Sequence, residues 1–312
     1  MRKISSFLII IAVLLSGFST AASAHGPVKV IKVYAGNGYT IGLYSDGSVK
    51  FAGEQSGRWN LSDVENWKDI DTIFVADTLA VGRKTDGSYI SNAGPIDIPG
   101  KLIALETGVV GEYVFLTSDG RLYHTPEDNP SDLVLLYDGR DRLGLEYPLW
   151  RELKGIEIGS DSAFGLRKDG TVVVCPSRYR DSGRFREIQG WTDIAAISMG
   201  FGYVPVGLKS DGAVVTVQAD PNNYGIDHDT SSWRSVIKIC SENNITIGLR
   251  SDGRVYATGG EWGRADYIAQ IERWTDIVDI ALSEDHVVGL KSNGTLVTAG
   301  SNDSRQCSLG NW

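Results

Sequence analysis

The sequence predicts an all-β protein, a seven-bladed β-propeller built from four-stranded antiparallel blades. Three observations support this prediction: a hairpin-turn signal recurs seven times, tryptophans recur in phase with it, and no helical period of apolar residues is visible after residue 24. A unit of about forty residues that holds four short strands is typical of one propeller blade. A single blade cannot bury its own faces, whereas a closed ring of blades can, and closure also protects the sheet edges.

Each unit is expected to contain its four strands in a fixed order. The first is a short apolar strand, as at 277–280, and the second lies just before the hairpin turn, as at 246–249. The third follows the turn, as at 254–257, and a weaker fourth segment ends at the next Trp. Consecutive strands joined by short turns pair as antiparallel neighbours, so each unit is predicted to be a meander.

The turn signal is an Asp-Gly or Asn-Gly pair between segments of alternating apolar residues. These residues are favoured because a type I′ turn needs a positive φ at both of its central positions. From the first copy to the last, the spacings are 40, 33, 50, 42, 41 and 41 residues, so the third unit begins early and is long. The seven pairs are Asp46-Gly47, Asp86-Gly87, Asp119-Gly120, Asp169-Gly170, Asp211-Gly212, Asp252-Gly253 and Asn293-Gly294.

Two further markers keep the phase of the turns. A Trp precedes the first strand of most units, as at Trp274, and a Gly-Leu pair lies just before the turn, as at Gly289-Leu290. The Trp expected after the second repeat is missing, and the third repeat has Phe115-Leu116 in place of Gly-Leu. The terminal Trp312 stands where a further unit would begin, and residues 28–31 resemble the continuation of such a unit. We therefore expect the two ends of the propeller to meet and close the ring.

The N-terminal segment has the order of a bacterial secretion signal. Met1-Arg2-Lys3 is positively charged, an apolar run follows at 7–15, and Ala22-Ser23-Ala24 has the small residues that signal peptidase accepts. The run is too short to span a bilayer comfortably, since about 20 residues are needed. We expect residues 1–24 to be cleaved and residues 25–312 to form a single propeller domain, secreted into the medium or the cell envelope. An uncleaved membrane anchor is the alternative interpretation.

The mature chain would be acidic and poor in cysteine. The leader contains two of the 30 basic residues and none of the 39 acidic ones, so the mature net charge would be −11. This charge disfavours nucleic acid and anionic membrane surfaces as partners, because phosphates need Lys and Arg. The three cysteines are Cys175, Cys240 and Cys307, an odd number that leaves at least one thiol unpaired. We expect three isolated thiols, and the sequence leaves open one bridge between two of them.

The repeat resembles that of the regulator of chromosome condensation family. The likeness is clearest from Trp274 to Cys307, a stretch that contains His286, the turn with its Gly-Leu pair, and Gln306. It extends over nearly the whole mature chain, and the resemblance implies the seven-bladed propeller of that family. The nuclear exchange-factor role of the eukaryotic founder does not suit an exported, acidic chain. The secreted bacterial propellers that inhibit β-lactamases have a similar architecture and use it as a protein-binding disc, although fold alone does not transfer activity.

In an antiparallel meander, successive connections lie at alternate ends of the strands, so each blade places its connections on two opposite faces of the disc. The loops between strands 1 and 2 and between strands 3 and 4 share one face, which we call the loop face. The Asp-Gly and Asn-Gly turns share the opposite face, the turn face, which is expected to be regular and without a binding role. The loop face is predicted to bind a protein, because aromatic side chains among acids provide typical interface anchors. The candidate binding residues are Tyr39, Trp59, Glu112, Tyr113, Phe201, Tyr203, Glu242, Trp262 and Asp285.

Two alternatives qualify this site. Each aromatic residue on the loop face could instead pack between blades, since Tyr and Trp are often partly buried. His286 occupies a position where the other repeats have mostly aromatic or apolar residues, so we expect it to pack rather than to bind a ligand.

Motifs of catalysis and metal binding do not accompany the repeat. The sequence has no His-Glu-x-x-His, Cys-x-x-Cys or Gly-x-Ser-x-Gly pattern. We expect a monomeric, non-catalytic binding module with no metal and no cofactor, whose partner is a protein or a component of the cell envelope. The alternatives are a carbohydrate-active hydrolase or lyase that uses loop-face carboxylates, and a structural repeat without a ligand. A contiguous apolar patch would favour protein binding, whereas a central pocket with converging carboxylates would favour an enzyme.

Overall fold

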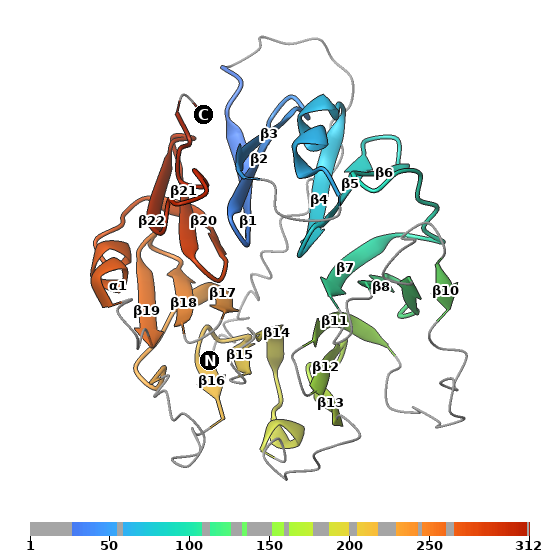
Figure 1. Cartoon of the computed structure of the whole chain (residues 1–312). Helices are drawn as coiled ribbons and strands as arrows, with labels where there is room; N and C mark the ends of the chain where they lie inside the picture. Colours follow the sequence, from blue (N-terminus) through green and yellow to red (C-terminus); the bar gives the residue numbers. More distant parts are fainter. Residues whose placement is uncertain are drawn as a thin grey trace, which may run out of the picture.

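The computed structural model shows an all-β ring of antiparallel sheets around a central axis (Figure 1). The first strands of successive sheets contact one another around the axis, and the first strand of the last sheet contacts that of the first sheet. The β-propeller prediction is therefore confirmed. The structure describes residues 27–54, 59–107, 113–125, 133–135, 152–158, 162–176, 187–199, 205–217, 229–242, 245–259, 265–310 and 312.

The described residues form seven sheets, each a meander of consecutive strands. The first four sheets contain β1 (Val30–Gly36), β2 (Tyr39–Tyr44) and β3 (Val49–Gly53); β4 (Ile70–Ala76), β5 (Leu79–Lys84) and β6 (Tyr89–Ser91); β7 (Leu102–Thr107), β8 (Tyr113–Thr117), β9 (Leu122–Thr125) and β10 (Val134–Leu135); and β11 (Leu153–Ile158), β12 (Ser162–Arg167) and β13 (Val172–Pro176). The last three contain β14 (Ile194–Ser198), β15 (Val206–Lys209) and β16 (Val214–Thr216); β17 (Val236–Glu242), β18 (Ile245–Arg250) and β19 (Val255–Gly259); and β20 (Ile277–Leu282), β21 (His286–Lys291) and β22 (Leu296–Gly300).

The expectation of four strands in every blade is not met. Among the described residues, only the third sheet has a fourth strand, the two-residue β10, and the other six sheets have three. Short helices occupy this part of three units: the 3₁₀ helices η1 (Leu61–Asn66) and η2 (Ile188–Gly190), and α1 (Ala265–Ile271). In η1, Leu61 and Val64 are both buried, and a spacing of three residues suits one helical turn rather than a strand. The Asn60 side chain caps this helix by accepting a hydrogen bond from the Ser62 N–H.

The hairpin turns also differ from the predicted type. All seven turn glycines have φ between 78° and 89°, but the Asp or Asn before each of them does not have a positive φ. In the first turn the Gly47 N–H donates to the Tyr44 carbonyl (3.0 Å), and the Asp46 carboxylate accepts a hydrogen bond from the Ser48 N–H (3.0 Å). This is a type I turn followed by a left-handed Gly, which needs only one positive φ. The acid is favoured because it accepts this backbone hydrogen bond.

The turns connect neighbouring blades through their glycine carbonyls. The Gly47 carbonyl accepts a hydrogen bond from the N–H of Ile70, the first residue of β4, at 3.0 Å. The Gly253 carbonyl makes the same bond to Ile277, the first residue of β20, also at 3.0 Å. The first strand of each of these blades therefore starts at the turn face and runs towards the loop face.

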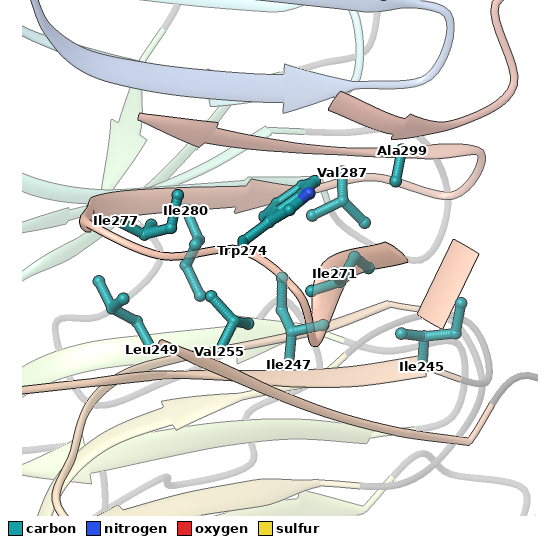
Figure 2. Close-up of a cluster of buried hydrophobic side chains, with 10 residues drawn as sticks. All are labelled: Ile245, Ile247, Leu249, Val255, Ile271, Trp274, Ile277, Ile280, Val287 and Ala299. Carbon is teal, nitrogen blue, oxygen red and sulfur yellow. The ribbon is translucent and has the colours of Figure 1, made fainter. Parts of the chain in front are cut away.

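The core of most blades is built on a Trp ring that covers the Gly of the second strand. A Cβ atom added to Gly289 would lie 2.9 Å from the Trp274 ring, and one added to Gly248 would lie 2.8 Å from the Trp233 ring. Figure 2 shows Trp274 within a cluster of buried apolar side chains between the last two sheets, together with Ile280 and Val287. Glycine is needed at these positions because any side chain would occupy the space of the indole ring.

The terminal Trp312 closes the ring. A Cβ atom on Gly42 in β2 would lie 2.7 Å from the Trp312 ring, so the last residue of the chain supplies the indole of the first blade. The first blade also contacts the last one through β1, which packs against β20 and β21. The prediction that the two ends meet is therefore confirmed.

Replacing Gly289 with Ala is expected to destabilise the protein by about 1–3 kcal/mol, because the new Cβ atom overlaps the Trp274 ring. Chemical unfolding followed by tryptophan fluorescence measures this change. The matched control is Gly190→Ala, since no atom lies within 4 Å of a Cβ at this exposed position, and its effect should stay within about 0.5 kcal/mol. Equal unfolding midpoints for the two variants would contradict the proposed role of the Trp–Gly contact.

Candidate functional site

The predicted binding residues fall into two groups. Four of them lie outside the described residues: Glu112, Phe201, Tyr203 and Trp262. The other five are described, and the structure places them in different environments: Tyr39, Trp59, Tyr113, Glu242 and Asp285.

The two described tyrosines pack between blades. Tyr39 is 2% exposed, and its hydroxyl donates a hydrogen bond to the Asp77 carbonyl of the next blade at 2.6 Å. Tyr113 is 4% exposed, and its hydroxyl shares a hydrogen bond with the Thr78 hydroxyl at 3.1 Å. Burial raises the pKa of Tyr39 above its usual value. The prediction that these rings are surface anchors is therefore wrong, because both fill the space between neighbouring sheets.

Asp285 belongs to a hydrogen-bond network around the buried His286. The His286 ring lies 2.8 Å from the Thr40 hydroxyl through Nε2 and 2.8 Å from the Asp285 carboxylate through Nδ1. The Ser283 hydroxyl and the Gln306 amide also donate to Asp285. Burial alone would raise the pKa of Asp285, but these hydrogen bonds outweigh it and lower the pKa. The carboxylate is engaged within the fold, and His286 has the packing role that its repeat position predicts.

Trp59 and Glu242 are both partly exposed. Trp59 lies between β3 and η1, and its contact with a partner stays a prediction. Glu242 is the last residue of β17, an inner strand, and it raises the pKa of Glu106 on β7 through charge repulsion. Glu242 therefore lies near enough to Glu106 to affect its protonation, at the loop-face end of its strand.

A cavity of about 460 Å³ lies at the centre of the ring, surrounded by the first strands of the blades. Alternate side chains of these strands face the axis, since successive residues of a strand point to opposite sides. Lys32 and Lys238 line the end near the turn face, because each is the third residue of its strand. Glu106 and Glu157 line the cavity two residues further along their strands, towards the loop face.

At the lysine end of the channel, Lys238 is paired with a carboxylate of the next blade. The Lys238 ammonium lies 2.6 Å from the Asp279 carboxylate, and the second oxygen of Asp279 accepts a hydrogen bond from the Val33 N–H at 3.3 Å. Burial alone would lower the pKa of Lys238, but the Asp279 carboxylate raises it above its usual value. For Lys32, burial lowers the pKa, and the neighbouring charge of Lys238 lowers it further.

Glu106 and Glu157, which we call the carboxylate level of the channel, form no ion pair with the part of the chain that the structure describes. Burial, together with a smaller contribution from repulsion by Glu242, raises the pKa of Glu106 to about 8. Burial and repulsion from Glu106 raise the pKa of Glu157 well above its usual value, although the Met199 N–H donates to this carboxylate at 3.0 Å. Neither Lys32 nor Lys238 contributes to these shifts. Glu106 is therefore mostly protonated at neutral pH.

Sequence reasoning missed Glu106 and Glu157, although a signal for them exists. The fifth residue of each first strand faces the axis, so the repeats can be aligned to read the lining of the channel. That column contains Tyr34, Phe74, Glu106, Glu157, Ser198, Cys240 and Ala281. Two neighbouring carboxylates at aligned positions that otherwise hold apolar or weakly polar residues indicate a cluster of acids inside the channel. Among the described residues, no group of three or more His, Cys, Asp or Glu is placed to hold a metal ion.

The turn face carries an apolar surface that was not expected there. Ile31, Ile237 and Val278 are 40%, 48% and 52% exposed and occupy the second position of β1, β17 and β20. These strands belong to three consecutive blades, with β20 in contact with both neighbours. We call the three residues the apolar crescent. In each strand the register shifts at this position, and the bulge leaves the side chain outside the core.

Comparison with known proteins supports the repeat and the fold. Residues 277–306 match the model of the "Regulator of chromosome condensation (RCC1) repeat", so the RCC1-type repeat inferred from the sequence is confirmed. No curated protein matches the chain by sequence. No helix of the described residues is long and apolar enough to cross a membrane.

Solved structures with a similar fold include two plant receptor-kinase ectodomains. The ectodomain of Physcomitrella patens CR4 has a TM-score of 0.54 and 13% identity over 88% of this chain and 74% of that chain. The CRINKLY WD40 ectodomain of Arabidopsis thaliana ACR4 has a TM-score of 0.51 and 14% identity over 88% and 97%. The β-propeller domain of Myceliophteria thermophila Cps50 (Swd1) has a TM-score of 0.51 and 9% identity over 90% and 100%. At these identities the likeness shows a β-propeller fold alone.

The Glu106→Gln variant is expected to gain stability relative to the wild type as the pH rises. The folded state holds the Glu106 proton more tightly than the unfolded chain, so the stability cost of this residue grows between the usual glutamate pKa of 4.5 and about 8 and persists above that pH. Gln cannot ionise and escapes that cost. Thermal unfolding across this range should therefore show a difference that grows with pH. The exposed control Glu272→Gln should keep the wild-type pH dependence, and parallel curves for all three proteins would refute the raised pKa.

Proposed function

We propose that the chain is a secreted, non-catalytic protein-binding module in which each of the seven sheets is one blade of a closed ring. The RCC1-type repeat and the propeller fold suggest a protein-binding scaffold. The observation that carries the proposal is the apolar crescent of Ile31, Ile237 and Val278, which are exposed on three strands that contact one another in sequence around the ring. Adjacent exposed apolar side chains mark interaction sites more often than isolated ones do.

The proposed module acts after export, as residues 25–312 and as a monomer. Its net negative charge favours a partner with basic residues around an apolar contact. N-terminal sequencing of the exported protein tests this part, and a mature chain that retains residues 1–24 would refute the cleavage.

The loop face is a second contact surface in this proposal. Trp59 is partly exposed, and Phe201, Tyr203 and Trp262 keep their predicted role as anchors. The two faces lie at opposite ends of the channel. One set of variants for each face can therefore separate their contributions to partner affinity.

One observation favours a carbohydrate-active enzyme as the second candidate, namely the carboxylates that converge in the central cavity. Glycoside hydrolysis by two carboxylates requires one protonated acid and one ionised base or nucleophile. Both Glu106 and Glu157 have raised pKa values, so neither has the environment of the ionised partner. Turnover of a polysaccharide panel that is abolished by Glu157→Gln would replace the binding proposal with the enzymatic one.

Replacing Ile31, Ile237 and Val278 together with Ser is expected to weaken partner binding by about 30-fold or more, because the apolar contact is lost. A photo-crosslinking residue at position 278 first identifies the partner in the secreted or envelope fraction. Surface plasmon resonance with the purified partner then measures affinity. Since all three side chains are exposed, the variant should unfold at the wild-type temperature.

The matched loop-face variant replaces Phe201, Tyr203 and Trp262 together with Ala. A loss of affinity in this variant alone would move the interface to the loop face and overturn the assignment to the crescent. Unchanged affinity in both variants would remove the support for a partner at either face.

A further inference from the structure

We propose that the carboxylate level of the central channel is a binding site for an organic cation, an ammonium or guanidinium group on an apolar stem. The site is formed by Glu106 on β7 and Glu157 on β11, with Glu242 on β17 towards the loop face. This inference goes beyond the proposed function and does not depend on it, because the channel is separate from the apolar crescent.

The first support is the bonding pattern of this level of the channel. At the fifth position of the first strands, the side chains of Tyr34, Glu157 and Ser198 each accept a hydrogen bond from a backbone N–H of the next blade. The Tyr34 hydroxyl accepts from Ile73 at 3.1 Å, and the Ser198 hydroxyl accepts from Ser241 at 2.9 Å. Glu157 follows the same rule with Met199. Among the described residues, the Glu106 carboxylate makes no hydrogen bond or ion pair, so it is the polar group of this level that remains for a ligand.

The second support is the separation of charge along the channel. The three lysines that line the cavity, Lys32, Lys154 and Lys238, are second or third residues of their strands and so lie towards the turn face. Lys238 is paired there with Asp279 at 2.6 Å. Among the described residues, neither Glu106 nor Glu157 forms an ion pair, and repulsion from Glu106 raises the pKa of Glu157. A buried acid that lacks a partner is costly unless it is protonated or paired. A bound cation would replace the proton on Glu106 and offset the repulsion from Glu157 and Glu242.

The size and lining of the cavity favour an organic cation over a metal ion. The described residues include no group of three or more acids, cysteines or histidines placed for a metal. The cavity of about 460 Å³ is larger than one ion requires, and Phe74, Ala104 and Ile197 contribute apolar wall. Such walls suit the methylene stem of an alkylammonium or guanidinium group, whose charged end would lie between the carboxylates.

Binding should be coupled to proton release. Glu157 titrates together with Glu106, because burial and repulsion from Glu106 raise the pKa of Glu157 well above its usual value. Burial holds the pKa of the Cys240 thiol at about 11 and raises that of Tyr34, and Lys238 keeps its charge beside Asp279. Lys32 lies at the opposite end of the cavity. Glu106, with a pKa of about 8, and Glu157, whose pKa is raised well above its usual value, therefore set the response together.

Isothermal titration calorimetry of the mature chain with spermidine tests the proposal. We expect one site, at least about tenfold tighter binding at about pH 8.5 than at about pH 6, and a binding enthalpy that depends on the buffer because a proton is released. Glu106→Gln and Glu157→Gln should each weaken binding about tenfold or more. Glu272→Gln removes one acid from an exposed position and should bind as the wild type does. Each Gln variant should remain folded, since Gln keeps the shape of the side chain and removes a charge that burial disfavours.

Further ligands distinguish the source of the cation. Binding of spermidine but not of N-acetyl-lysine amide or N-acetyl-arginine amide would support a free polyamine, whereas binding of an amide would support an inserted basic side chain. The absence of heat with all three, or binding unaffected by both channel substitutions, would overturn the proposal. Displacement of spermidine by Ca²⁺ alone would also overturn the proposal. So would binding at several weak sites whose affinity Glu272→Gln also lowers.

Discussion

The packing of most blades in this propeller depends on a contact between a Trp indole and a glycine of the second strand. In the blades of Gly42, Gly82, Gly207, Gly248 and Gly289, a Trp ring lies where the glycine Cβ would be. The third blade has neither partner: no Trp precedes it, and the glycine position holds Phe115, which is fully buried. The two departures compensate for each other, because a position that no indole covers has room for a large side chain that fills the same core.

Much of this organisation could be predicted from the sequence, since it rests on local signals. Asp-Gly turns, in-phase tryptophans and the Gly-Leu pairs indicate the repeats, and Trp312 indicates where the ring closes. The type of turn could not be predicted, because Asp-Gly suits both a two-residue loop and a type I turn with a left-handed Gly. The helical turn at Leu61–Asn66 was missed because its buried residues, Leu61 and Val64, are too few to show a period.

The candidate sites were harder to predict, since they depend on which way a side chain points. Strand parity places Tyr39 and Tyr113 at the loop end of their blades, but it does not show that both rings turn inwards between sheets. The exposure of Ile31 depends on a register shift between Val30 and Lys32, which leaves no mark in the sequence. The carboxylates of the channel were readable from the alignment of repeats, but their altered pKa values depend on burial, which only the assembled ring creates.

Closure through Trp312 has a consequence for the order of folding. The contacts of an Asp-Gly hairpin are local and form quickly, whereas the indole of the first blade must arrive from the far end of the chain, from residue 312 to residue 42. Contacts with such a large sequence separation form late, because the entropy of closing the loop is lost before the contact is made. Until then the first sheet packs only against the second blade, and its other face, around Gly42, is open to water. The blade that comes first in the chain is thus the last to be completed, and the ring is an arc until that moment.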